Sequence, residues 1–298
     1  MAASKVIIVR GSGVRPRPGE TNRTVLLRMY EHGIRLLTGQ ADPASGWRSL
    51  FSPSDRVGIK INTIAGRELT TPPDVSLPLA NLLAQAGLKE KNIIIWDRTN
   101  RELRNAGYLL NIENSGVKVF GTDTAGAGYE AENIVHFNIG SLFSTIQSDL
   151  VTASISLAVL KDHGMAGVTA GMKNYFGAIH NPNKYHDTHC DPFVAELFDA
   201  PRIRTKHRLT ILDALTVQFH RGPSYHARWA ELFEGLIFST DPVAADQVGW
   251  QIIEKLRRGK SLPSLEEERR PPLYIQTAAR MGLGKTAAAD IQIIEEAV

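Results

Sequence analysis

Short apolar runs rich in β-branched residues alternate along the chain with longer stretches in which apolar residues recur at helical spacing. The short runs predict buried strands, because a strand covered on both faces carries apolar residues at nearly every position. They lie at residues 5–10, 56–62, 92–97, 116–121, 133–138, 153–160, 208–214 and 235–240, and residues 290–294 predict a further edge strand.

The longer stretches predict helices between these strands. Pro73 stands where one helix begins and Gly87 where it ends, a common placement of these two residue types. Asp241 and Pro242 open another helix, with the aspartate as its N-cap. Helices are predicted at residues 21–37, 73–86, 99–110, 168–176, 191–198, 241–257 and 273–281, and a charged, proline-rich loop at residues 261–272.

This order of strands and helices predicts an α/β fold. The expected architecture is a largely parallel, doubly wound sheet with helices on both faces, because each parallel connection must cross over the sheet. No internal repeat or linker divides the chain, so residues 1–298 are expected to form a single large domain. Residues 259–298 are expected to pack on its core as a C-terminal extension, and residues 11–21 and 185–191 to form long functional loops.

Composition narrows the range of partners. The 298 residues carry a net charge of +3, and no basic run is interleaved with aromatic residues, so nucleic acid is not an expected partner. No apolar run reaches the length of a membrane-spanning helix. The single cysteine excludes an intrachain disulfide and an iron–sulfur cluster held within this chain. The Met-Ala-Ala-Ser start fits a cytoplasmic chain, and it also fits an exported, periplasmic chain whose leader was trimmed before Ala2.

Polar residues follow several predicted strands at their carboxyl ends, where ligands bind in parallel sheets. Lys60 and Asn62 end one strand, and Asp97 ends the next. Lysines and a histidine that meet at one sheet edge suit a small anionic ligand such as a carboxylate or a phosphate. The strand ends further along the chain carry Lys161, Asp162 and His163, then Asp213, and finally Thr240 and Asp241.

Residues 160–190 concentrate histidines, lysines and the only cysteine of the chain. His163, His180 and His186 are candidates for binding a divalent metal, although their spacing matches no standard structural zinc site, and solvated loop residues explain it as well. Lys173 and Asn174 follow a glycine-rich segment that suits anion binding. A Lys173 side chain that extends into solvent is the alternative.

Asp246 lies among small apolar residues in the predicted helix 241–257. A buried carboxylate is costly unless it is paired, which predicts Lys60 or Lys161 as its partner. Cys190 is expected to pack in the interior rather than to react, because no cation flanks it in the sequence.

The segment LKDHGMAGVTAGMKNYFGAI, residues 160–179, resembles a family catalogued only as domain of unknown function 362, and the resemblance extends over residues 55–250. Asp162 stands where relatives commonly carry threonine. The resemblance implies no established reaction. It rests on Lys60-Ile61-Asn62, Pro73–Gly87, Trp96-Asp97, the residues Lys161, His163, Thr169, Lys173, Asn174 and Gly177, and the segments 211–214 and 241–246.

Relatives in this family often carry a ferredoxin-like iron–sulfur segment, which implies redox settings. This chain has one cysteine and cannot hold that segment, so a redox role would require a partner protein. Some relatives resemble proteins exported by a twin-arginine leader, which favours the exported alternative.

Two functional hypotheses follow. In the first, the protein is an enzyme acting on a small anionic substrate, with His163, Lys161 and Lys173 as catalytic residues. His163 then acts as general acid–base, or binds a divalent metal with His180 or His186. In the second, it is a non-catalytic ligand- or cofactor-binding accessory protein of a redox system. The residues expected to contact the substrate are Lys60, Asn62, Thr169, Asn174, Asp213 and Asp246.

Overall fold

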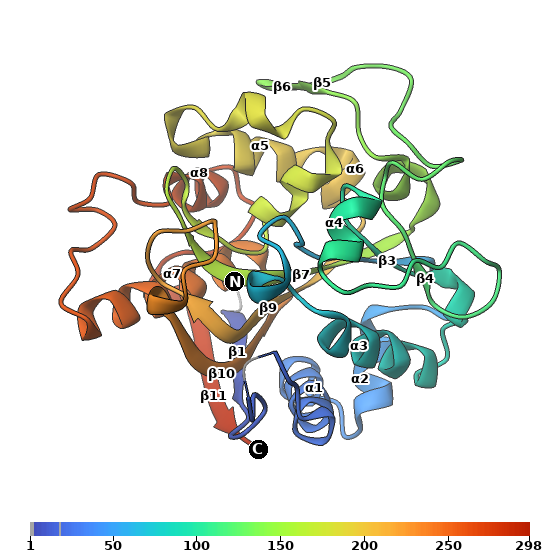
Figure 1. Cartoon of the computed structure of the whole chain (residues 1–298), viewed down its shortest axis with the longest axis horizontal. Coiled ribbons are helices and arrows are strands. Elements are labelled where there is room, and N and C mark those ends of the chain that lie inside the picture. Colours follow the sequence, from blue (N-terminus) through green and yellow to red (C-terminus); the bar gives the residue numbers. More distant parts are fainter. Residues whose placement is uncertain (1–2, 18) are drawn as a thin grey trace.

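Nine strands form one sheet in the order β11-β1-β10-β9-β7-β2-β3-β4, with β8 beside β7 (Figure 1). The computed structural model describes residues 3–17 and 19–298. Met1 and Ala2 at the chain start, and Pro18 of the predicted loop 11–21, lie outside the described residues. The strands are β1 (Ser4–Arg10), β2 (Val57–Lys60), β3 (Ile93–Trp96), β4 (Lys118–Val119), β7 (Ala153–His163), β8 (Gly167–Thr169), β9 (His207–Gln218), β10 (Ala230–Ser239) and β11 (Ile291–Ala297).

Helices cover both faces of this sheet, as the sequence pattern predicts. Side chains alternate between the faces of a strand, so Ile7 of β1 joins the apolar core under α1, α2 and α3, whereas Ile8 joins the core under α5, α7 and α8. Figure 1 shows α1–α3 gathered on one side of the sheet and α5, α6 and α8 on the other. The helices are α1 (Arg23–Thr38), α2 (Pro43–Leu50), α3 (Pro73–Gln85), α4 (Asn100–Asn105), α5 (Phe193–Asp199), α6 (Pro201–Arg204), α7 (Pro242–Gly259) and α8 (Leu273–Arg280).

The sheet is parallel except at β10 and β8. β10 runs antiparallel to both β1 and β9, and β8 runs antiparallel to β7. Thr240 and Asp241 therefore lie at the opposite sheet edge from Lys60, and the prediction that these strand ends share one edge is wrong. Asp241 caps α7, as predicted, and its carboxylate accepts the backbone N–H of Ala244 at 2.9 Å.

The helix predicted over residues 168–176 does not form. Residues Gly167–Thr169 make β8, and Lys173–Ala178 make a short 3-10 helix. Gly167 has a φ of +75°, and a Cβ at that position would lie 2.6 Å from the carbonyl oxygen of Arg270, so the turn after β7 requires glycine. The backbone thus returns antiparallel along β7 before any helical turn begins.

Other differences from the predicted elements are local. The run at 133–138 forms β5 (Ile134–His136), which pairs with β6 (Ile139–Ser141) in a separate two-stranded sheet. The helix after β3 ends at Asn105, five residues before the predicted end at Leu110. Helix α2 was not predicted, although its N-cap Asp42 is followed by proline, the same signal that predicts α7.

The C-terminal residues pack on the core of the domain. Arg270 donates a hydrogen bond of 2.6 Å to the buried carboxylate of Asp162, next to the turn between β7 and β8. β11 adds a parallel edge strand to β1, in register from Ser4 opposite Ile291 to Arg10 opposite Ala297. Within residues 3–17 and 19–298, no helix combines the length and apolar character needed to cross a bilayer.

Helix α1 lies close to the sheet because Gly33 faces it. A Cβ at Gly33 would lie 2.4 Å from the ring of Phe238 in β10, far inside van der Waals contact. Tyr30, one turn earlier, packs edge-on against the same ring, with 6.2 Å between ring centroids. The Phe238 ring therefore packs directly against the backbone of α1 at Gly33, and this contact sets the distance between the helix and the sheet.

We expect Gly33→Ala to lower the free energy of unfolding by about 1–3 kcal/mol, because the methyl group forces α1 or Phe238 to move. Gly259→Ala is the matched control at the end of α7, where nothing lies within 4 Å of the added Cβ. The control should be neutral or stabilising by up to about 1 kcal/mol. Urea denaturation measures both; equal effects of the two substitutions would contradict the close contact.

Candidate functional site

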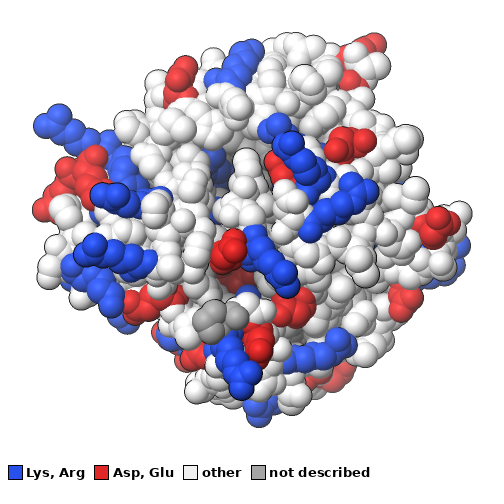
Figure 2. Space-filling model, viewed as in Figure 1, with Lys and Arg blue, Asp and Glu red and all other residues white. Residues whose placement is uncertain are grey.

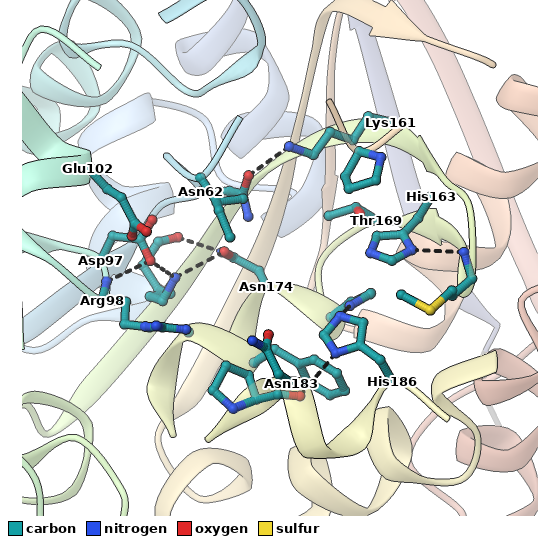
Figure 3. Close-up of a pocket in the computed structure, with 18 of the residues that line it drawn as sticks. Asn62, Asp97, Arg98, Glu102, Lys161, His163, Thr169, Asn174, Asn183 and His186 are labelled. Atoms are coloured by element: carbon teal, nitrogen blue, oxygen red, sulfur yellow. Dashed lines mark hydrogen bonds and ion pairs between the residues drawn. The ribbon is translucent and has the colours of Figure 1, made fainter. Parts of the chain in front are cut away.

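A cavity of about 250 Å³ opens at the carboxyl ends of β2, β3 and β7. Figure 3 shows Lys161 and His163 on one side of this space, and Asp97 and Arg98 on the other. Most of the candidate residues predicted from the sequence meet here. Those that line the cavity are Lys60, Asn62, Lys161, His163, Thr169, Lys173, Asn174 and His186.

Lys60 is fully buried, and its ammonium group is already satisfied. Its Nζ donates to Asp97 Oδ1 at 2.6 Å, to the carbonyl oxygen of Ile61 at 2.6 Å and to Asn174 Oδ1 at 3.2 Å. The other oxygen of Asp97 accepts the N–H and the hydroxyl of Thr63, at 2.8 and 2.6 Å. With three acceptors and a paired charge, Lys60 holds the wall of the cavity and has little capacity left for a ligand.

Asn174 and Gly177 explain how this ion pair fits into the wall. Asn174 donates from Nδ2 to the carbonyl oxygen of Lys60 at 2.8 Å, while its Oδ1 accepts from the Lys60 ammonium. A Cβ at Gly177 would lie 2.8 Å from Lys60 Nζ and 2.9 Å from Asp97 Oδ1. Any larger residue at 177 would therefore push into the ion pair.

Lys161 and Lys173 differ from Lys60, because neither has a carboxylate within ion-pair distance in the described part of the chain. Their side chains are nonetheless buried, with residue exposures of 1% and 6%. Lys161 Nζ donates to Asn62 Oδ1 at 2.9 Å. Lys173 Nζ lies 3.3 Å from Nε2 of His186 and 4.2 Å from the centroid of the Phe176 ring.

Charged side chains of both signs are mixed on the face of the molecule drawn in Figure 2. Over the face seen in Figure 2, Lys and Arg side chains are interspersed with Asp and Glu, in keeping with the small net charge of +3. On this face the basic side chains do not form one continuous patch.

His163 and His186 lie with stacked rings, 5.7 Å between centroids, and their hydrogen bonds require opposite tautomers. Nδ1 of His163 accepts the backbone N–H groups of Met165 and Ala166, both at 3.2 Å, so the proton of the neutral ring sits on Nε2. Nδ1 of His186 lies 3.0 Å from the carbonyl oxygen of Pro182 and must donate to it, which leaves Nε2 to accept from Lys173. His163 thus offers the cavity an N–H donor.

Burial shifts the pKa values of these groups towards their neutral forms. The pKa of Lys161 is lowered from 10.5 to about 7, chiefly by burial, with Lys173 acting in the same direction and Asp97 opposing. Burial lowers the pKa of Lys173 to about 8. Burial, followed by the charge of Lys173, holds the pKa of His163 far below its usual value of 6.5, so its ring stays neutral.

Asp246 supports the site from outside the cavity. Its carboxylate accepts the N–H groups of Gly171 at 2.7 Å and Met172 at 3.1 Å, just before Lys173. The prediction that Lys60 or Lys161 pairs with Asp246 is wrong. Backbone N–H groups satisfy this carboxylate, and the Tyr274 hydroxyl lies 3.5 Å from its Oδ2. Burial raises the pKa of Asp246 to about 7.

Asp213 and His180 also lie away from the cavity. Asp213 lines a separate hollow of about 710 Å³ with Arg15 and Asp74, because its side chain points to the sheet face under α1 and α3. His180 is exposed and packs against the ring of Tyr129. His180 therefore does not join His163 and His186, and the described residues contain no group of three or more His, Cys, Asp or Glu side chains placed to hold a metal ion.

Several cavity residues were not among the predicted site residues. Asp97 was recognised as a strand end but was not assigned to the site, and Arg98 and Glu102 follow it. Asn183 and Pro223 come from loops whose sequences carry no pattern that places them beside β7. Cys190 is buried in the core, as expected, and burial raises the pKa of its thiol.

Comparison with known proteins gives three findings. The sequence model of a family described as "Domain of unknown function (DUF362)" matches residues 57–251. A protein of Synechocystis sp. named "Thylakoid-associated protein sll1697" is 28% identical over 160 residues, which cover 50% of this chain and 48% of that protein, so the chain spans about half the length of this relative. A crystal structure of a protein from Thermotoga maritima aligns with a TM-score of 0.44 at 10% identity, covering 81% of this chain and 60% of that one.

The two unpaired lysines predict a pH dependence of stability. Their folded-state pKa values of about 7 and 8 lie below the value of 10.5 for a free side chain, so over this interval the unfolded chain binds more protons than the folded one. The free energy of unfolding is therefore expected to rise as the pH increases from about 7 to about 9. Urea denaturation in a buffer free of small anions measures it.

The control for this prediction removes one amine at a time. Lys161→Met should stabilise the protein at pH 7 and reduce the slope, because the cost of the buried amine disappears. Lys89→Met, at an exposed lysine, should leave the slope unchanged. A slope that is the same in wild type and in Lys161→Met would show that this amine keeps its ordinary pKa.

Proposed function

Because the chain belongs to the family described as domain of unknown function (DUF362), a description that names no reaction, we propose a function from its cavity: an enzyme that acts on a small anionic substrate. The supporting observation is that Lys161 and Lys173 line one cavity without a carboxylate partner among the described residues. A buried ammonium group is unfavourable without an opposite charge. A bound carboxylate or phosphate supplies that charge.

The cavity offers such an anion three hydrogen-bond donors from two elements. Lys161 and His163 come from β7, and Lys173 from the 3-10 helix that follows β8. The Nε2–H of His163 makes no other hydrogen bond in the described part of the chain, and its neutral ring adds a donor without adding charge. The space of about 250 Å³ favours a ligand of a few heavy atoms over a large cofactor.

The roles of the two lysines and the histidine then separate. A lysine whose pKa is about 7 can both accept and donate a proton near neutral pH, so Lys161 is the acid–base group. The sequence predicts His163 as a general acid–base. Because its Nδ1 already accepts two backbone N–H groups, we assign it the role of a neutral hydrogen-bond donor instead. Such a donor stabilises negative charge that develops on a substrate oxygen.

A binding protein without turnover would use the same cavity. The two functions separate when the protein is incubated with small hydroxy acids, oxo acids and phosphate monoesters, and their consumption is followed by proton NMR. Consumption of one class that stops in folded Lys161→Met supports the enzyme. Saturable anion binding with no consumption of any class supports the accessory protein.

We expect sulfate to bind in the cavity with an affinity that falls as the pH rises from about 7 to about 9. Sulfate keeps its charge over this range, whereas Lys161 and Lys173 lose their protons at about pH 7 and 8 when the cavity is empty. Isothermal titration calorimetry in two buffers of different ionisation enthalpy should show proton uptake on binding. Lys173→Met should weaken binding about tenfold or more, and exposed Lys89→Met should not. Binding that is independent of pH would contradict the assignment.

Substitutions of His163 distinguish its structural role from its contact with the ligand. Asn at 163 provides an acceptor near the position of Nδ1, so His163→Asn should keep the bonds to Met165 and Ala166 while removing the Nε2–H donor. We expect it to retain most of the free energy of unfolding and to weaken sulfate binding by about tenfold. His163→Ala should lose both, because the N–H groups of Met165 and Ala166 lose their acceptor. Unchanged sulfate affinity in folded His163→Asn would remove His163 from the site.

A further inference from the structure

Building on the anion site of the proposed function, we propose that the Lys161 amine forms a Schiff base with a carbonyl group of the substrate. The substrate class is then a small carboxylate that also bears a ketone or aldehyde, of which the 2-oxo acids are the simplest. The unprotonated Lys161 amine is then the covalent residue in place of a simple acid–base group, Lys173 holds the carboxylate, and His163 donates to the carbonyl oxygen.

Lys161 is the strongest nucleophile that the cavity contains. Its wall includes no serine or cysteine side chain among the described residues, and Cys190 is packed in the core. The Lys161 amine makes one side-chain hydrogen bond, to Asn62 Oδ1 at 2.9 Å, in contrast to the three acceptors that surround Lys60. An amine with a single acceptor keeps its lone pair available once it has lost a proton.

The neighbouring Lys173 favours the reactive form of Lys161. A second cation in the same desolvated space disfavours protonation of the first, a known way to activate a lysine as a nucleophile. Lys173 is held by the Phe176 ring and by Nε2 of His186, which is an acceptor and leaves Lys173 its charge. Burial lowers the pKa of both amines, so the division of roles rests on the contacts that hold Lys173 against Phe176 and His186.

The step balances without an external oxidant or reductant. The neutral Lys161 amine attacks the carbonyl carbon, a C–N bond forms, and the carbonyl oxygen takes a proton to give a carbinolamine. Loss of this oxygen as water leaves a protonated imine, so that amine, carbonyl compound and one proton give iminium and water. The His163 Nε2–H, whose Nδ1 is fixed by backbone, stabilises the oxygen while it carries negative charge.

The test is reductive trapping with pyruvate. The 298-residue chain is incubated with pyruvate and sodium borohydride, which delivers a hydride to the imine carbon and fixes a secondary amine. Intact mass and peptide mapping then locate the adduct, whose mass is that of pyruvate less one oxygen. We expect one adduct per chain, on Lys161, absent from Lys161→Arg and undiminished in Lys89→Arg. No adduct, or an adduct spread over surface lysines, would overturn the proposal.

Lactate separates this proposal from the proposed function. It carries the carboxylate but no carbonyl group, so it should compete with pyruvate and reduce trapping without forming an adduct itself. Sulfate or lactate binding without pyruvate trapping would overturn the Schiff base and leave the anion site intact. Failure of both binding and trapping would overturn the proposed function as well. Folded Lys173→Met should trap pyruvate at least tenfold more slowly, whereas equal trapping would remove Lys173 from its carboxylate-holding role.

Discussion

The buried ion pair between Lys60 and Asp97 is the interaction on which the rest of the cavity depends. It joins the carboxyl ends of β2 and β3, and through Asn174 it fixes the 3-10 helix that carries Lys173. A buried pair is stable only when its remaining donors and acceptors are also satisfied, and here backbone and side-chain groups complete both partners. The charges of Lys60 and Asp97 therefore neutralise each other without a ligand. Among the buried cations that line the cavity, Lys161 and Lys173 have no ion-pair partner in the described residues, which is why these two lysines, and not Lys60, define what the cavity can bind.

Much of this arrangement could be predicted from the sequence, because two strong physical regularities apply. Apolar runs that are covered on both faces mark the strands, and parallel strands bring their carboxyl ends to one edge. Together these rules bring Lys60, Asn62 and Lys161 into one cavity from segments a hundred residues apart. The same rules failed for Asp241, because a short apolar run does not reveal its direction and β10 runs antiparallel to its neighbours.

What the sequence could not reveal depends on geometry at the scale of single bonds. Asp246 was expected to pair with a lysine, yet backbone N–H groups satisfy it, and no sequence pattern distinguishes these partners. The tautomers of His163 and His186 follow from which backbone group lies beside each Nδ1. In this fold His163 is an N–H donor, and His186 accepts a hydrogen bond from Lys173.

The last strand of the chain has a consequence for how this protein is handled. β11 shields the backbone of β1, whose central residues, from Val6 to Val9, are apolar and buried, while β11 itself presents Glu295 and Glu296 outward. Acidic side chains on an outermost strand discourage pairing with other molecules. Proteolytic loss of these few residues would leave β1 as the outermost strand with unpaired amide and carbonyl groups, the kind of edge that pairs with other chains, even though every cavity residue remained in place.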